Sequence, residues 1–270
     1  MKIAIIGSGN LAWHLAGVLP YPTTVVYRAD RPTEGWPCAL LPLSEMSRLD
    51  WDAVFLAVPD QAIAPVSREL AIRIPLGVPV FHTSGATPLD QITPSFLHRG
   101  VLWPIRSLRK GEAISHWREL PLVLQAEGKV AADVLTTISG QLSETISWLN
   151  DRQRAQLHLA AVFSNNFVTA LYEVAHDLCS RHAVPFDLLL PIIRHTALSQ
   201  DGTRPALRQT GAAARGDHAT MNRHLELLDQ PAYRDLYQMI STLILQYRLP
   251  EHDPHFRREP YDDFEDQGIL

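Results

Sequence analysis

Short apolar, β-branched runs alternate with amphipathic segments through the first half of the chain. Runs of this kind predict parallel strands that helices cover on both faces. The alternation therefore predicts an α/β fold with a doubly wound, mostly parallel sheet. The predicted strands lie at residues 2–6, 24–27, 52–59, 78–82, 100–107, 121–124 and 145–148. The predicted helices between them lie at residues 13–19, from about 61 onward, and at 129–142.

The pattern changes after about Asn150, where the strand signals stop. One helical pattern covers residues 151–181, and further helical stretches lie near 186–199, 217–229 and 231–248. We therefore expect an α/β domain at 1–150 and an all-α domain at 151–250. Residues 251–270 are polar and acidic, which predicts an extended tail that is disordered or wraps a partner.

Composition excludes several classes of function. Hydrophobic residues make up 46% of the 270 residues, and the net charge of −5 disfavours nucleic acid as a partner. Cys38 and Cys179 lie far apart, which argues against a disulfide scaffold or a cysteine-rich zinc site and fits a reducing, cytoplasmic compartment. No segment offers about twenty uninterrupted apolar residues, so we expect no membrane span.

A glycine-rich motif follows the first predicted strand directly. It reads G-x-G-x-x-A, with Gly7, Gly9 and Ala12 at the defining positions. Gly7 permits a tight turn, Gly9 lets the backbone approach a diphosphate at a helix N-terminus, and Ala12 allows close helix–strand packing. The context predicts a dinucleotide site; the alternative is an ordinary strand–turn–helix corner. The predicted contacts are Gly7, Ser8, Gly9, Asn10 and Leu11.

The end of the second predicted strand bears on the choice of nucleotide. An NAD site usually places an acidic residue there, to accept a hydrogen bond from the ribose 2′-hydroxyl. This chain has Arg28 instead, with Arg31 nearby, and a guanidinium suits a 2′-phosphate. The sequence thus favours NADP over NAD. Asp30 would reverse this preference if the register slipped, and both arginines could also belong to a solvated loop.

The carboxyl ends of the next two predicted strands carry further candidates. In an open parallel sheet these ends form the ligand crevice, so Val58 and Pro59 should lie beside the cofactor. His82 follows the next strand and is a candidate proton donor, with Thr83 and Ser84 as candidates to orient a nicotinamide or a substrate carbonyl. The alternative is that the two hydroxyls only stabilise a local turn.

The long predicted helix at 151–181 has an unusual polar line. No Lys, Asp or Glu occurs between Arg154 and Glu173, and neutral hydrogen-bonding groups suit a cleft better than open water. On this hypothesis His158 acts as an acid/base and Asn165 orients the substrate; the alternative is a plain solvent face. The polar line comprises Arg154, His158, Asn165, Thr169, Tyr172 and His176, and the opposite side carries Phe163, Phe167, Leu171, Val174 and Leu178.

A loop of small residues, Thr210–Asp217, precedes the next helical stretch. Asp217 is well placed as a helix N-cap. Arg215 is the one long cation in the loop and could hold a substrate carboxylate or a partner protomer; a plain connecting loop is equally simple.

These motifs occur in one order, and together they resemble a bacterial family that joins a Rossmann-like domain to a helical domain of unknown function. That family is related to 6-phosphogluconate dehydrogenase, ketopantoate reductase, pyrroline-5-carboxylate reductase and deazaflavin-dependent NADP oxidoreductase. The resemblance spans about residues 1–248 and implies an NADP-binding first domain and a helical second domain, like the C-terminal domain of 6-phosphogluconate dehydrogenase, that commonly builds a homodimer. The motifs are Gly7-x-Gly9-x-x-Ala12, Ala57–Asp60, His82–Ala86, Gly100-x-x-x-Pro104, Ala160–Phe167 and Thr210–Asp217.

The chain also departs from these relatives. The β-hydroxyacid dehydrogenases and ketopantoate reductases use Lys-x-x-x-Asn on the first long helix of the second domain. Asn165 matches the Asn, but Ala161 stands where those enzymes have the lysine. His158, one turn earlier, is the nearest candidate replacement.

The sequence thus predicts an NADP-dependent reductase that passes hydride to a small carbonyl or imine held between the two domains. His158 and His82 are the predicted proton donors, Asn165 orients the carbonyl and Arg215 anchors the substrate. The missing lysine favours an alternative of another class, a nucleotide-binding sensor or scaffold without turnover.

Overall fold

The computed structural model describes residues 1–28 and 35–247. The chain divides into two compact units, Met1–Val168 and a second that begins at Thr169. The expectations for Asp30, Arg31 and the tail at 251–270 fall outside the described residues. Each unit is described below by itself.

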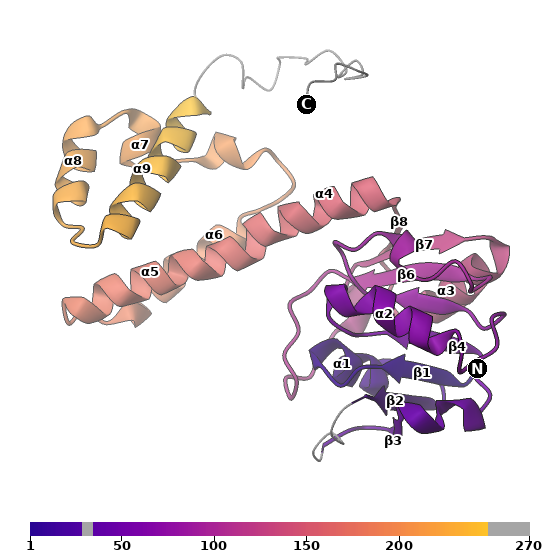
Figure 1. Cartoon of the computed structure of the whole chain (residues 1–270). Coiled ribbons are helices and arrows are strands. Elements are labelled where there is room, and N and C mark those ends of the chain that lie inside the picture. Colours follow the sequence, from indigo (N-terminus) through magenta and orange to yellow (C-terminus); the bar gives the residue numbers. More distant parts are fainter. Residues whose placement is uncertain (29–34, 248–270) are drawn as a thin grey trace, which may run out of the picture. The chain divides into compact units, whose positions relative to one another are not determined.

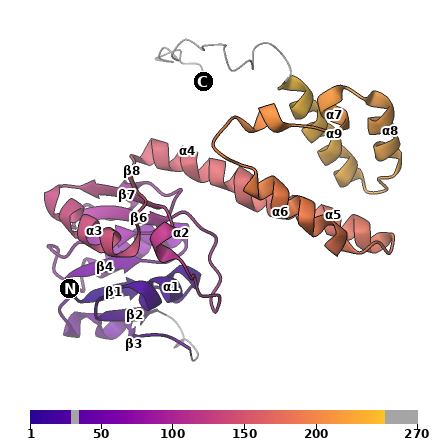
Figure 2. The ribbon, with the colours of Figure 1, turned by 180° about the vertical axis from the view of Figure 1, so that it is seen from behind.

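The described part of the first unit contains an eight-stranded sheet with the order β3-β2-β1-β4-β5-β6-β7-β8 (Figure 1). Edge strands β3 and β8 lie at opposite sides of it (Figure 2). The first six strands in this order are mutually parallel, whereas β7 pairs with β6 in antiparallel fashion. The strands are β1 (Ile3–Ile6), β2 (Thr23–Tyr27), β3 (Ala39–Pro42), β4 (Ala53–Leu56), β5 (Val80–His82), β6 (Arg99–Pro104), β7 (Leu122–Glu127) and β8 (Ile146–Trp148).

The strand order reverses direction at β1. The strands β1 and β4 are neighbours, with Ile3 opposite Ala53, and β2 pairs with the other side of β1, with Ile3 opposite Thr23. In open α/β sheets of this order, the crevice at the carboxyl ends of the reversing strands is where ligands bind. The predicted doubly wound, mostly parallel sheet is therefore confirmed, together with every predicted strand.

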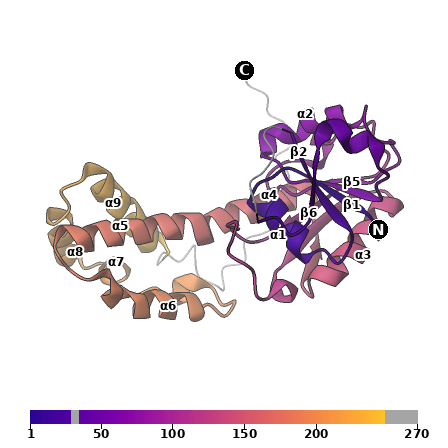
Figure 3. The ribbon, with the colours of Figure 1, turned by 90° about the horizontal axis from the view of Figure 1, so that it is seen from below.

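Helices cover both faces of the sheet. The helices α1 (Asn10–Val18) and α3 (Lys129–Leu142) lie on one face, and α2 (Asp60–Leu70) lies on the other (Figure 3). Successive residues of β1 enter different cores: Ile3 and Ile5 pack with α1 and α3, whereas Ala4 and Ile6 pack with α2. Burial on both faces explains why these strands are uniformly apolar.

The structure differs from the expected elements at two places. No strand was predicted at β3, because this short edge strand is only partly buried and ends in proline. The helix α1 begins at Asn10, three residues before the predicted start, because the glycine turn itself opens the helix.

A long helical stretch follows β8, as predicted for residues 151–181. It consists of α4 (Asp151–Ala161), a π-helical segment at Val162–Phe167 and α5 (Val168–Arg181). Asn150 starts it with a capping box: its side chain accepts from the Gln153 N–H, and the Gln153 side chain accepts from the Asn150 N–H. The periodicity of the sequence did not reveal the π-helical segment.

The side chain of Arg154 fixes α4 against the sheet. It is 1% exposed. One guanidinium nitrogen donates to the Thr87 carbonyl at 2.5 Å and to Asp151 Oδ1 at 2.7 Å, and the other donates to the Gln125 side chain in β7. Asp151 Oδ1 also accepts from the Leu89 N–H at 3.0 Å.

Apolar packing also holds α4 against the sheet. Leu157 contacts a small core formed by Leu89, Val101, Trp103 and Val123.

The second unit is all helical in its described residues. Asp217 caps α8 (His218–Glu226) as predicted, by accepting from the Thr220 N–H at 3.0 Å. The apolar residues of the second unit are largely exposed. Among its described residues, only Ala213 and Leu228 are buried hydrophobics, whereas Leu198 is 85% exposed. The helices after α5 are α6 (Leu190–Leu198), α7 (Ala212–Arg215), α8 (His218–Glu226) and α9 (Pro231–Gln246). Of all the helices described, none combines the length and apolar character that a membrane crossing requires.

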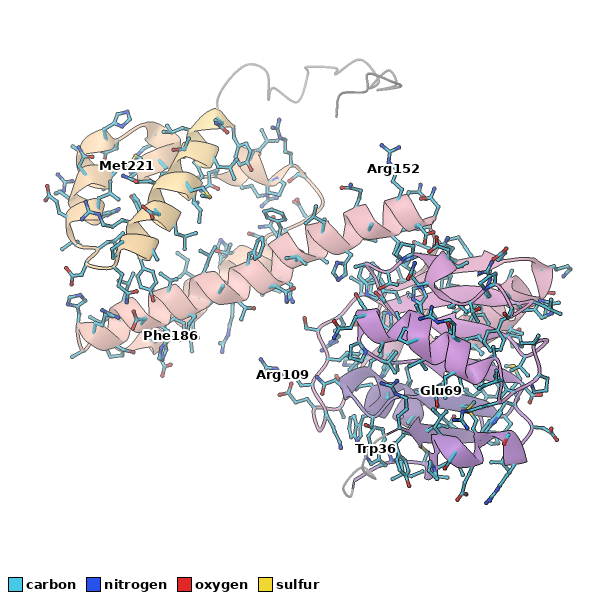
Figure 4. All side chains as sticks on the ribbon, in the orientation of Figure 1. Trp36, Glu69, Arg109, Arg152, Phe186 and Met221 are labelled. Carbon is cyan, nitrogen blue, oxygen red and sulfur yellow. The ribbon has the colours of Figure 1, made fainter. Side chains whose placement is uncertain are left out.

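The burial of Arg154 generates a prediction about stability. Replacing it in R154L leaves Asp151, Gln125 and the Thr87 carbonyl without their partner, which should lower the free energy of unfolding by about 3–5 kcal/mol. Urea denaturation of the full chain measures this loss. Arg152 lies two residues away, on the exposed side of α4, with its side chain pointing out from the ribbon (Figure 4). R152L should change stability by no more than about 0.5 kcal/mol. A loss in R154L that matches R152L would contradict the assignment.

Candidate functional site

The turn between β1 and α1 requires glycine at its first position. Gly7 has φ +119°, and a Cβ there would collide with the carbonyl oxygen of Ala57 and lie 3.2 Å from Val58 Cγ1. The end of β1 thus packs directly on the chain leaving β4, at the point where the strand order reverses. Val58 and Pro59 follow β4 at this same corner.

Gly9, unlike Gly7, is not packed against another segment of the chain. No described atom lies within 4 Å of a Cβ placed on Gly9, so its backbone borders open space. Gly9 is the N-cap of α1 and supplies no side chain to cap the helix, which leaves first-turn N–H groups available. Ser8 and Asn10 are exposed beside it. Free amides and the positive end of the helix dipole together suit an anion such as a diphosphate.

The loop after β6 reaches the first turn of α1, which the sequence did not predict. Asn10 Oδ1 accepts from the Lys110 N–H at 3.2 Å, and His14 Nε2 donates to the Arg109 carbonyl at 2.9 Å. The Lys110 ammonium lies 4.7 Å from the ring centre of Trp36. Figure 4 shows Arg109 extending from this loop. Two cationic residues therefore stand close to the glycine turn.

Arg28 is exposed directly after β2. It lines an open cavity of about 500 Å³, together with Tyr27 and Arg73. The remaining lining residues are Pro42, Leu43, Ser44 and Glu69. Of the two residues that the sequence offered for the ribose contact, Arg28 and Asp30, the structure describes only Arg28.

The hydroxyls that follow β5 are used locally. Thr83 Oγ1 donates to the Leu56 carbonyl at 3.1 Å. Ser84 Oγ accepts from the N–H groups of Ala86 and Thr87 at 3.2 and 3.0 Å. Both side chains are buried. These bonds match the alternative that the sequence left open, in which the two hydroxyls stabilise a turn.

His82 is fully buried, which disfavours the predicted role as a proton donor. Burial, reinforced by the nearby Arg154 guanidinium, lowers the pKa of His82 to about 3. Its Nδ1 accepts from the Ser84 N–H at 3.2 Å, so the neutral ring carries its proton on Nε2. A neutral imidazole with no exposed surface supports the turn and does not release a proton near pH 7.

A second cavity, here called the α4 pocket, lies where the loop after β6 meets α4 and the π-helical segment. Its volume is about 430 Å³. Asn165 Nδ2 donates to Ser107 Oγ at 2.7 Å, and the rings of Trp103 and His158 lie 5.5 Å apart. The pocket is lined by Trp103, Ile105, Arg106, Ser107, His158, Ala161, Val162, Ser164, Asn165 and Asn166.

Gly85 permits this arrangement. A Cβ on Gly85 would stand 2.5 Å from Trp103 Cε2 and 2.6 Å from His158 Cδ2, so only glycine lets the three segments meet. The buried Arg154 holds α4 one turn before His158, and the π-helical segment turns Asn165 toward Ser107. Segments of π-helix are frequent at functional sites.

The structure brings together some predicted residues and not others. His158 and Asn165 line one pocket, with Ala161 in its wall. Arg215 is exposed at the end of α7 in the second unit. The sequence analysis missed Trp103, Arg106 and Ser107, although the carboxyl end of a predicted strand was a signal that pointed there. No feature of the sequence predicted that Gly85 would contact His158.

Comparisons with known proteins agree with this fold. Residues 120–244 match the family model of a domain of unknown function, DUF2520. No curated protein matches the chain. A crystal structure of BF3122 from Bacteroides fragilis, provisionally named an NADP oxidoreductase, is 28% identical, with a TM-score of 0.81 over 91% of this chain and 98% of that one.

Two more distant structures share the fold. An imine reductase from Myxococcus stipitatus, in complex with NADP⁺, is 13% identical with a TM-score of 0.60, over 92% of this chain and 94% of that one. A pyrroline-5-carboxylate reductase from Coxiella burnetii is 16% identical with a TM-score of 0.54, over 91% and 96%. The fold is that of Rossmann-type oxidoreductases. The resemblance drawn from the motifs is therefore confirmed at the level of the fold.

The environment of His82 predicts a pH dependence of stability. Between the folded pKa of about 3 and an unfolded value of about 6.5, the unfolded chain binds one more proton than the folded chain. The free energy of unfolding should therefore decrease as the pH is lowered from about 6.5 to 4.5. His82 should contribute about 1.4 kcal/mol per pH unit to that decrease. In H82N this contribution should disappear. Urea denaturation at several pH values measures it.

The exposed His116 provides the matched control. H116N should keep the wild-type slope. Equal slopes for wild type and H82N would show that His82 is not held neutral.

Proposed function

We propose that the protein is an NADP-dependent reductase that adds hydride to a small carbonyl or imine. The observation that carries the proposal is the glycine turn, where Gly9 borders open space at the uncapped N-terminus of α1. The Bacteroides fragilis structure, named provisionally as an NADP oxidoreductase, supports it. So does the imine reductase, whose structure contains NADP⁺ on the same fold.

The residues at the reversal of the sheet fit this cofactor. The amides of Ser8, Gly9, Asn10 and Leu11 would hold the diphosphate. Arg28, exposed after β2, would bind the 2′-phosphate. Val58 and Pro59, which follow β4, would contact the cofactor between its diphosphate and its nicotinamide. Thr83 and Ser84 would stabilise the neighbouring turn after β5. When bound, the reduced nicotinamide supplies the hydride.

The α4 pocket then supplies the proton and the orientation. His158 is half-buried beside Trp103, and an imidazole is well suited to donate a proton near neutral pH. The Asn165 amide, held by Ser107, would orient the substrate oxygen or nitrogen. Because Ala161 occupies the lysine position of the relatives, His158 takes over the acid role in this proposal.

A second candidate function is a nucleotide-binding sensor without turnover, which Ala161 favours. The two candidates share the cofactor site and differ at His158. Titration of the protein with NADPH, followed by a panel of keto acids, ketones and cyclic imines, separates them: consumption of NADPH supports the reductase, and tight binding without consumption supports the sensor.

A variant of His158 tests the catalytic assignment. H158Q keeps a polar side chain but loses the proton donor, so kcat should fall by about 10²- to 10⁴-fold. The dissociation constant for NADPH, measured by its fluorescence, should stay within about twofold because His158 lies outside the glycine turn. H218Q, which changes an exposed histidine at the start of α8, is the control and should keep full activity. Loss of NADPH affinity in H158Q, or retention of kcat, would refute the role.

The second unit is further proposed to build a homodimer. Ile192, Leu198, Leu227 and Met239 in its described helices are exposed by 62%, 85%, 70% and 70%. A helical unit that buries so few of its apolar side chains needs a partner surface to be stable in water. The resemblance to relatives that commonly build homodimers supports a second copy of this chain as the partner. Arg215 at the end of α7 would then contribute either to the partner contact or to substrate binding.

Sedimentation equilibrium tests the dimer. The full chain should sediment as two copies of 30.2 kDa. L198E and M239E should shift the equilibrium toward single chains, and L97E, which alters an exposed leucine between β5 and β6 in the first unit, should not. A monomeric wild type would contradict the assignment.

A further inference from the structure

We infer that the α4 pocket binds a substrate with a carboxylate group, and that Arg106 anchors that carboxylate. The inference rests on the proposed function, because it names the substrate class of the same pocket. It moves the anchoring role, which the sequence had suggested for Arg215, to a residue that lines the cavity beside His158.

The charges that line the pocket support an anion. Arg106 is the only Lys or Arg among the lining residues, and no Asp or Glu is among them. Several arginines of this unit have acidic partners, among them Arg109 with Glu112 at 3.8 Å and Arg118 with Glu144 at 2.8 Å. Of the unpaired arginines described in this unit, Arg106 is the one that lines the α4 pocket. Within residues 1–28 and 35–247, Arg106 makes no ion pair. The pocket therefore carries an uncompensated positive charge.

The other lining groups suit a small planar acid. Ser107 and Asn166 offer neutral hydrogen bonds, and the Trp103 indole forms an apolar wall. A guanidinium binds a carboxylate with two parallel hydrogen bonds, which fixes orientation as well as position. A volume of about 430 Å³ accommodates a substrate whose carboxylate and reacting carbon are close together. 2-Oxo acids and cyclic imino acids have this arrangement of carboxylate and reacting carbon.

The reaction on such a substrate balances in one step. Hydride from NADPH forms the new C–H bond at the carbonyl or imine carbon, while the C=O or C=N π bond breaks. The electron pair moves to oxygen or nitrogen, which takes a proton from His158. NADPH is oxidised to NADP⁺, and the product is a 2-hydroxy acid or a cyclic amino acid that keeps its carboxylate on Arg106.

Matched substrate pairs test the inference with the full chain. Pyruvate is compared with acetone, and 1-pyrroline-2-carboxylate with 1-pyrroline, by following NADPH consumption. We expect the acid of a reactive pair to have the higher kcat/KM. R106M should lower kcat/KM for the acid by about 10- to 100-fold, mainly through KM, and leave the neutral partner unchanged. R106K should recover part of the loss, because it restores the charge but not the paired hydrogen bonds.

The control is R118M, which changes an exposed arginine of the same unit outside the α4 pocket and should leave both substrates unchanged. Thermal denaturation of R106M should match wild type, because Arg106 is exposed and a loss of activity should not come from unfolding.

A binding readout separates this inference from the proposed reductase. Oxamate, an unreactive planar carboxylate, is titrated calorimetrically into wild type and R106M with NADP⁺ present. Binding that R106M loses supports the inference, and it does so even if no substrate consumes NADPH, in which case the reductase proposal alone fails. If NADPH is consumed equally with acids and neutral partners in wild type and R106M, the reductase stands and the inference is overturned. Oxamate binding of equal strength in both proteins also overturns it.

Discussion

The buried guanidinium of Arg154 is the constraint on which the geometry of the α4 pocket depends. Desolvating a cation is costly, and the cost is offset only when its donors find acceptors in fixed positions. Here those acceptors lie on three different segments: Gln125 in β7, the Thr87 carbonyl after β5 and Asp151 at the start of α4. Burial alone would raise the pKa of Asp151, but the Leu89 N–H and Arg154 lower it below its usual value, so the pair stays charged. The direction of α4 is set by this requirement, and with it the position of His158 one turn later.

The same requirement shapes the surroundings of the pocket. The Arg154 charge helps to keep His82 neutral, and neutral His82 accepts the N–H that stabilises the turn leading to Gly85. Gly85 in turn allows Trp103 and His158 to approach each other. A network that looks structural therefore determines where the proton donor of the proposed reaction stands. The cofactor corner is built on a different principle, since Gly7 packs tightly on the chain leaving β4 while Gly9 leaves its amides open.

Sequence patterns predicted the parts of this molecule that depend on local rules. Apolar runs predicted every strand that is buried on both faces, and they failed for β3, which is short, partly exposed and ends in Pro42. The glycine motif predicted the turn, and Asp217 was recognised as a cap. The pocket depends on contacts between distant segments, which carry no local signature. Arg154 was therefore read as one residue of a polar helix face, although it is buried. His82 was read as a proton donor, although its surroundings keep it neutral, and the π-helical turn at Asn165 has the composition of ordinary helix.

In the proposed function, an anion-binding corner at the reversal of the sheet acts together with the α4 pocket, which a buried arginine holds in place. A crystal structure of the full chain with NADP⁺ is the most direct test of that union. The account predicts the diphosphate on the amides of Ser8–Leu11, the 2′-phosphate at Arg28, and the nicotinamide ring within about 4 Å of the side chains lining the α4 pocket. A nicotinamide directed away from Trp103, His158 and Asn165, or a nucleotide bound away from the glycine turn, would contradict it.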